Sequence, residues 1–271
     1  MATIALGPAS INYILDGAGE WLVLLHEIGG TLETWSAVAP AFSPRFRVLR
    51  YDQRGAGRSE KITGAFSIDT QIDDLAVLLD KLGAVGRCHI AGVAIGAAIA
   101  VRFAVKHPKR VRSLVLACPA PGVGADRVKY VTERAALVER EGMAATVDSS
   151  LANSYPPAVR HDSAAFDAYR SRFLANDPAS YAAINRAFVH FDVTRDLLRI
   201  ACPVLVLAGG HDRLRPPDLV RGVAVAIAGA EYRQIDSGHV MPVQAPGPMI
   251  GAMQVFYDRL GGARAAAAKT P

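Results

Sequence analysis

The feature of this sequence that most restricts its fold is a regular alternation of short apolar runs with longer helical patterns. Several of the runs are nearly continuous in Val, Leu and Ile, as strands buried on both faces must be. The candidate strands lie at residues 21–25, 46–51, 88–92, 111–117, 203–208 and 231–236. Between them, stretches such as 68–82 repeat apolar side chains at three- and four-residue spacing. Because parallel strands need helical crossovers, the alternation predicts an α/β fold with a mainly parallel, doubly wound sheet.

One long segment, residues 122–198, interrupts the alternation because it contains no convincing strand. It holds helical patterns at residues 127–141, 143–153, 164–175 and 179–191. We therefore expect a core made of residues 1–121 and 199–262, with 122–198 inserted as a helical cap and 263–271 as a flexible tail. An insertion at the carboxyl ends of parallel strands lies over the crevice where such sheets bind ligands.

The composition excludes several other classes of protein. With 51% hydrophobic and 20% charged residues, a chain of 271 residues can bury a full core and is not globally disordered. Cys88, Cys118 and Cys202 lack the spacing of a disulfide scaffold or a thiolate zinc site, and they indicate a reducing, cytoplasmic location. No apolar run reaches the roughly 18 to 20 residues of a membrane helix. The first ten residues do not resemble a signal peptide either.

The net charge of +5 does not indicate a nucleic-acid partner, because the Arg and Lys residues are scattered rather than gathered in one patch. We also expect no membrane partner. The seven histidines show no metal-ligand pattern, so we predict neither a metal nor a cofactor. The expected partner is a small-molecule substrate, and the sequence gives no oligomeric state.

The turn at residues 92–96 carries the first chemical signal. A predicted strand ends in Gly-Val-Ala-Ile-Gly, and an Ala-rich helical pattern begins at once. Gly-x-X-x-Gly between a strand and a helix is the pattern of a nucleophile elbow, in which the central residue projects at the top of the sheet. That residue should be Ser, Cys or Asp, but here it is Ala94. Glycines that only allow tight strand–helix packing are the alternative interpretation.

A nucleophile at such an elbow works with an acid, a base and an oxyanion hole. Three further segments of the chain occur where these groups are expected. Asp212 follows a buried run and a short loop, which is the place of the triad acid. His239 follows the last predicted strand and is the candidate general base. Residues 26–30, His-Glu-Ile-Gly-Gly, follow an early strand, where the oxyanion hole takes its first N–H. We therefore predict that the backbone N–H groups of Ile28 and Ile95 form the oxyanion hole.

Together these segments resemble the α/β-hydrolase superfamily over nearly the whole chain. Within it, the chain looks most like the 3-oxoadipate enol-lactonases and related hydrolases of small carboxylates. The stretches that carry this narrower resemblance are residues 32–35, 46–59, 177–183 and 202–212. The resemblance implies hydrolysis of a small ester or lactone, in which a serine at the place of Ala94 attacks, His239 takes its proton and Asp212 orients the imidazole.

The chain departs from the family's pattern at Ala94, and three interpretations compete. In the first, Ala94 stands in place of a serine, and the chain is an inactive variant of a working hydrolase. In the second, Ala94 is natural, and His239 with Asp212 activates water or abstracts a substrate proton, as in a C–C or amide hydrolase, a lyase or a cofactor-free oxygenase. In the third, the chain is a non-catalytic small-molecule binding protein. The intact acid–base pair favours catalysis, and we take the first interpretation as the main prediction.

The second departure is Glu27, where relatives commonly have Gly or an Asn-Ser pair. Its carboxylate either points to solvent or belongs to the site. We take His26, Glu27 and Arg134 as candidate substrate-binding residues. The predicted cap offers further cations, at Arg127, Lys129, Arg160, Arg170, Arg172 and Arg186. A guanidinium that faces the crevice would suit an anionic substrate.

Overall fold

The structure of the protein is a computed structural model that describes the backbone of residues 1–267 and the side chains of residues 1–261. Its strands are β1 (Ala2–Leu6), β2 (Ala9–Asp16), β3 (Glu20–Leu25), β4 (Phe46–Tyr51), β5 (Cys88–Val93), β6 (Val111–Ala117), β7 (Val204–Gly209) and β8 (Glu231–Ile235). Its α-helices are α1 (Ile68–Lys81), α2 (Ile95–Lys106), α3 (Ala125–Glu141), α4 (Val147–Ser154), α5 (Ser163–Leu174), α6 (Pro178–Val189), α7 (Thr194–Leu197), α8 (Pro217–Ala226), α9 (Met241–Gln244) and α10 (Pro246–Ala267).

These strands form one sheet in the order β1-β2-β4-β3-β5-β6-β7-β8. The pairs β1–β2 and β2–β4 are antiparallel, and all pairs from β4 to β8 are parallel. The predicted α/β class with a mainly parallel sheet is confirmed. The β1–β2 hairpin was not predicted, because its half-exposed strands carry no continuous apolar run. Gly7, at a φ of 64°, forms the turn between them.

The sheet is buried on both faces, and β3 shows why its sequence is continuously apolar. Leu22 and Leu24 belong to the apolar cluster on the face that α10 covers. Val23 and Leu25 point to the opposite face and join the cluster formed with α1, α2 and α8. Because successive side chains of a strand alternate between faces, a strand between two helical layers needs an apolar residue at each position.

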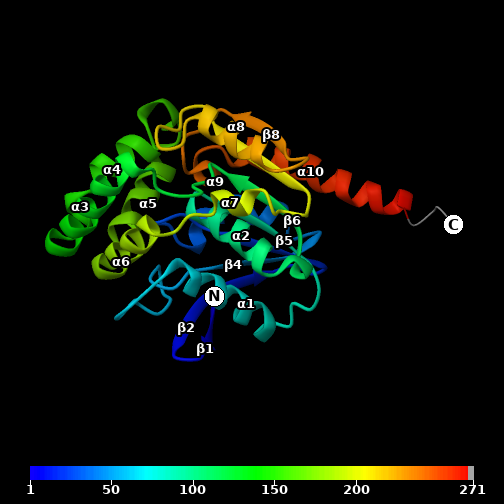
Figure 1. Cartoon of the computed structure of the whole chain (residues 1–271), viewed down its shortest axis with the longest axis horizontal. Helices are drawn as coiled ribbons and strands as arrows, with labels where there is room; N and C mark the ends of the chain where they lie inside the picture. Colours follow the sequence, from blue (N-terminus) through cyan, green and yellow to red (C-terminus); the bar gives the residue numbers. More distant parts are fainter. Residues whose placement is uncertain (268–271) are drawn as a thin grey trace.

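The chain between β6 and β7 contains helices α3 to α7, joined by loops and short 3₁₀ turns. Figure 1 shows α3, α4, α5 and α6, in green, gathered at one end of the sheet. They enclose an apolar cluster of their own, which includes Leu151, Tyr169 and Phe173, and it reaches Val240 of the core. This part of the chain therefore packs on the sheet end at which the loops after β5, β7 and β8 emerge.

The last helix is longer than we expected. Helix α10 runs to Ala267, so residues 263–267, which we expected to be part of a flexible tail, are helical. This agrees with the high helix propensity of the Ala run there. The remainder of the predicted tail, residues 268–271, lies outside the described residues. Among the described helices, none combines the length and the apolar character that a membrane crossing requires.

The start of α2 fixes how the strands and helices meet. Gly96 lies so close to the end of β3 that a Cβ atom there would be 2.5 Å from the Leu25 carbonyl oxygen and 2.7 Å from that of His26. We predict that Gly96→Ala lowers the free energy of unfolding by about 1–3 kcal/mol, because neither backbone can retreat without disturbing the sheet.

Gly222 is the matched control, since it is an exposed helical glycine in α8 with open space around its Cα. There the same substitution should raise the free energy of unfolding by about 0.5–1 kcal/mol, through helix propensity alone. Urea unfolding of both variants measures the difference. Equal effects at the two positions would contradict the close approach at Gly96.

Candidate active site

Ala94 occupies a strained turn between β5 and α2. Its φ of 54° and ψ of −115° lie outside the regions that non-glycine residues prefer. The turn is sharp because Gly92 and Gly96 nearly touch: a Cβ on Gly92 would lie 2.4 Å from the carbonyl carbon of Gly96. Ala94 lines a cavity together with His239, so the residue at this position faces a space where a ligand could lie.

Asp212 and His239 come from the loops after β7 and β8 and form a buried pair. The Nδ1 atom of His239 lies 2.7 Å from Oδ2 of Asp212. The other carboxylate oxygen, Oδ1, accepts hydrogen bonds from the backbone N–H groups of Leu214 and Arg215. With Nδ1 donating to Asp212, the Nε2 atom of His239 carries the free lone pair. His239 lines the same cavity as Ala94, so its imidazole can act there as a base.

The electrostatics of Asp212 suit this role. Burial by itself would raise the pKa of its carboxyl group. The charge of His239, their hydrogen bond and the two backbone N–H donors outweigh burial and hold the pKa below its usual value. Asp212 therefore favours its ionised form, in which it can fix the tautomer of His239 and would stabilise an imidazolium if His239 took a proton.

Cys118 completes a compact group with this pair. Among the described residues, the possible metal-ligating atoms of Cys118, Asp212 and His239 lie within 4.8 Å of one another. Burial and the nearby charge of Asp212 raise the pKa of the Cys118 thiol, which opposes the thiolate that a metal requires. Asp212 and His239 are already joined to each other. The arrangement therefore fits a positioned acid–base pair better than a metal site.

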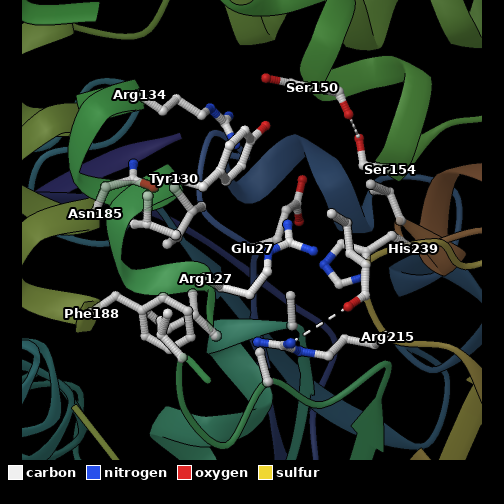
Figure 2. Close-up of a pocket in the computed structure, with 18 of the residues that line it drawn as sticks. Glu27, Arg127, Tyr130, Arg134, Ser150, Ser154, Asn185, Phe188, Arg215 and His239 are labelled. Carbon is white, nitrogen blue, oxygen red and sulfur yellow. Dashed lines mark hydrogen bonds between the residues drawn. The ribbon is translucent and has the colours of Figure 1, made fainter. Parts of the chain in front are cut away.

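The cavity measures about 140 Å³ and lies between the sheet end and helices α3 to α6. A space of about 150 Å³ can hold a molecule the size of benzene, so the ligand is small. Ile28 and Ile95, the predicted oxyanion-hole residues, both line it. The N–H of Ile95 stands in the first turn of α2, where backbone donors have no partner within the helix. Figure 2 shows His239, Glu27 and the side chains of α3 converging on this space.

His26 connects the loop after β3 with the loop after β4. Its Nδ1 lies 2.8 Å from the carbonyl oxygen of Glu27, and its Nε2 accepts the backbone N–H of Gln53 at 3.0 Å. The Nε2 contact joins the loop after β3 to the loop after β4, whereas the Nδ1 contact stays within the first loop. His26 is absent from the residues that line the cavity with Ala94. The structure thus places His26 against Gln53, outside the cavity that Ala94 lines.

Arg134 and Arg127 of α3 both line the cavity. Arg134 donates to the hydroxyl of Tyr181, whereas Arg127 forms no ion pair in the described chain. The other predicted cap cations lie outside the cavity: Lys129, Arg170 and Arg186 pair with Glu133, Asp148 and Glu139, and Arg160 and Arg172 lie over the rings of Phe166 and Tyr169.

The sequence analysis missed Arg215, which also lines the cavity. Its place three residues after Asp212 could have indicated it. Burial lowers the pKa of Arg215 most, and the charge of Arg127 lowers it further against the opposing effect of Asp212. Two guanidiniums that repel each other across a cavity favour an anion between them.

Glu27 belongs to this cavity and does not point to solvent. Its side chain is 3% exposed. The Oε1 atom accepts hydrogen bonds from the hydroxyl groups of Thr34, at 3.1 Å, and Tyr169, at 2.9 Å. The hydroxyl of Tyr169 stays protonated, because burial and the charge of Glu27 raise its pKa. Thus Glu27 is tied to the core through Thr34 and to α5 through Tyr169.

Comparisons with known proteins agree with the fold class. The model of a family described as alpha/beta hydrolase fold matches residues 20–246. A Caulobacter protein provisionally named carbamate hydrolase RutD is 31% identical over 93% of each chain. The structure of the enol-lactonase from Burkholderia xenovorans is 28% identical, with a TM-score of 0.89 over 95% of this chain and 100% of that one. A malate-bound thermophilic esterase from Thermogutta terrifontis is 26% identical, with a TM-score of 0.89 over 95% and 96%.

The buried contact between Asp212 and His239 leads to a prediction about the free energy of unfolding. At about pH 7, Asp212→Asn should lower the free energy of unfolding by about 1–3 kcal/mol, because a charge-assisted hydrogen bond is lost. The folded-state pKa of Asp212 is depressed, so its contribution is complete above the ordinary carboxyl value of about 3.9 and disappears as the pH falls through the lower folded value. The difference between variant and parent should therefore narrow by about pH 3.

Asp236→Asn is the matched control, since Asp236 contacts His211 at 2.8 Å in an exposed pair. Exposed pairs contribute little, and this change should cost less than about 0.5 kcal/mol at any pH. Urea unfolding at both pH values checks the prediction. A pH-independent loss in Asp212→Asn would mean that the carboxylate charge does not stabilise the fold.

Proposed function

This chain belongs to the α/β hydrolase family, and from that membership we propose that it hydrolyses a small ester or lactone carrying a carboxylate, with His239 as the proton acceptor. The observation that carries the proposal is the 2.7 Å contact between His239 and Asp212, in the cavity that Ala94 also lines. The members of the family compared above are named for enol-lactone, ester and carbamate chemistry. All three reactions begin with attack on an acyl carbon, for which this arrangement of base and elbow is suited.

The arginine side chains support an anionic substrate. Arg127, Arg134 and Arg215 line the cavity, and Arg127 has no anionic partner in the described chain. The Nε atoms of Arg134 and Arg215 are buried without a hydrogen-bond partner. A carboxylate would satisfy such donors and relieve the repulsion between Arg127 and Arg215. A small carboxylate ester or lactone, as in 3-oxoadipate enol-lactonases, fits this charge.

The strained elbow supports a serine-type mechanism in which Ala94 stands at the place of the nucleophile. A φ of 54° is unfavourable for alanine, and strain of this kind is typical of positions that hold a reacting side chain. With serine at that position, His239 would take the hydroxyl proton as the oxygen attacks. The N–H groups of Ile28 and Ile95 would hold the oxyanion, and water would then release the acyl group.

In a second version of the mechanism, a water molecule attacks the substrate directly. The alanine at position 94 favours this version. The side chain of Ala94 ends at Cβ, and Ala94 and His239 line the same cavity, so a water molecule could take the place of a serine oxygen. His239 would then deprotonate that water for attack on the same carbonyl. Both versions use His239 and Asp212 alike, and they differ only in the attacking oxygen.

Ala94→Ser separates the two versions. If Ala94 replaces a serine, this change should raise the hydrolysis of activated esters and lactones by several orders of magnitude, since loss of a triad nucleophile costs about 10⁶-fold in turnover. Stopped-flow assays with 4-nitrophenyl esters measure the rate, and a burst of acyl-enzyme formation identifies the covalent route. His239→Ala added to Ala94→Ser is the control and should abolish the gain.

If Ala94→Ser gains nothing while the unaltered chain turns over an ester or lactone, the water version stands. If His239→Ala leaves turnover unchanged in the active form, the proposed function is wrong in both versions. If no ester or lactone is hydrolysed by either chain while small acids still bind, the binding-protein interpretation replaces it.

The role of the arginines is tested by Arg127→Gln in the active form. The KM for a monoester of glutarate, which carries a carboxylate, should rise about tenfold or more, because a charged hydrogen bond contributes about 1.5–3 kcal/mol. The KM for the uncharged butyrate ester should hardly change. Arg170→Gln, whose side chain pairs with Asp148 on the outer surface, should leave both values unaltered. Equal effects on the two esters would argue against carboxylate binding by Arg127.

A further inference from the structure

Glu27 has one carboxylate oxygen that the fold leaves without a partner. Both hydroxyl donors, from Thr34 and Tyr169, converge on Oε1. The Oε2 atom is buried and has no hydrogen-bond or ionic partner among the described residues. Glu27 lines the cavity together with Ala94 and His239. A buried carboxylate oxygen without a donor is unfavourable, which makes this atom one that a ligand would satisfy.

The surrounding loop is shaped to hold this carboxylate. The chain turns back at Gly30, whose N–H donates to the Glu27 carbonyl oxygen at 3.1 Å. A Cβ atom at Gly30 would lie 2.3 Å from Oε1 and 2.7 Å from Oε2, so any larger residue there would displace the carboxylate. With Oε1 fixed from both the core and α5, the carboxylate cannot rotate freely, and the direction of Oε2 is set in advance.

The position of Glu27 in the chain places it beside the reacting group. Ile28, the next residue, carries the N–H group proposed to bind the carbonyl oxygen of the substrate. In Figure 2 the Glu27 carboxylate is seen near the centre of the cavity, with Arg134 toward the top of the view and Arg215 toward the bottom. The cavity therefore offers cationic donors for a carboxylate and a separate anionic acceptor close to the scissile carbonyl.

We propose that Glu27 determines substrate specificity, with Oε2 accepting a hydrogen bond from a hydroxyl or ammonium group that the substrate carries next to its scissile carbonyl. The proposal rests on the function proposed above and narrows it. The substrate class becomes an ester or lactone of a hydroxy or amino acid that bears a second carboxylate. An ionised carboxylate only accepts hydrogen bonds, so an analogue with hydrogen in place of the donor leaves Oε2 unpaired.

The test uses Glu27→Gln and three small acids that resemble such products. Glutarate, 2-hydroxyglutarate and glutamate share one skeleton and differ only in bearing hydrogen, hydroxyl or ammonium at one carbon. In Glu27→Gln the amide oxygen takes the hydroxyls of Thr34 and Tyr169, so the NH₂ group replaces Oε2. The substitution thus exchanges one acceptor for a donor at nearly constant volume.

Calorimetric titration of each acid, with both enantiomers of the chiral ones, gives the affinities. The parent chain should bind at least one hydroxy or amino acid about tenfold or more tightly than glutarate. Glu27→Gln should lose that preference, while its affinity for glutarate should not fall, because removal of a negative charge does not weaken the binding of an anion. Glu33→Gln is the matched control, since Glu33 lies in the following 3₁₀ helix Leu32–Trp35 and does not line this cavity. It should leave the preference intact.

The titrations distinguish failure of the proposed role of Glu27 from failure of the proposed carboxylate site. Equal binding of all three acids by the parent chain overturns the role of Glu27, and this result does not depend on the folding of any variant. A preference that survives in Glu27→Gln overturns it too. A larger preference for the hydroxy or amino acid in Glu27→Gln than in the parent chain would also contradict the proposal, because an amide NH₂ group cannot accept the hydrogen bond of the ligand. If the parent chain binds none of the acids and Arg127→Gln behaves like the parent in the ester assay, the carboxylate site itself fails, and this inference fails with it.

Discussion

The close approach between the start of α2 and the end of β3 is the constraint on which the site depends. Gly96 can lie against the carbonyl oxygens of Leu25 and His26 only because it has no side chain. This contact holds the turn at Ala94 in its strained conformation. It also brings the first N–H of α2 next to the loop that follows β3. One backbone contact thus positions both the nucleophile position at Ala94 and the proposed oxyanion donors, the N–H groups of Ile28 and Ile95.

The sheet topology brings the remaining groups to the same point. Because β5, β7 and β8 run parallel, their carboxyl ends meet at one edge, and the residues that follow them lie close together. Asp212 and His239 are 27 residues apart in sequence but touch for this reason. Helices α3 to α6 cover this space, and burial of Asp212 and His239 strengthens the electrostatic interaction between them.

The charges in the cavity are not distributed evenly. Arg127, Arg134 and Arg215 give it a cationic side, while Glu27 adds an acceptor beside the proposed oxyanion hole. A carboxylate near a developing oxyanion would oppose catalysis in a simple esterase, because like charges repel. A hydrogen-bond donor on the substrate that lies between the Glu27 carboxylate and the oxyanion would reduce this repulsion. The unusual residue in the loop after β3 is therefore understandable as part of substrate recognition rather than as a defect in the site.

The sequence by itself determined the α/β class, the elbow around Ala94, and the pairing of Asp212 with His239, because buried strands and sharp turns leave local patterns in composition and glycine spacing. It did not determine the β1–β2 hairpin, whose half-exposed strands carry no such pattern. Only the tertiary structure decided that His26 joins two loops, that Glu27 is buried, and that Arg127, Arg134 and Arg215 reach the cavity while the other arginines of the predicted cap do not line it. The direction of a long side chain depends on neighbours that are distant in sequence, and local patterns contain no record of them.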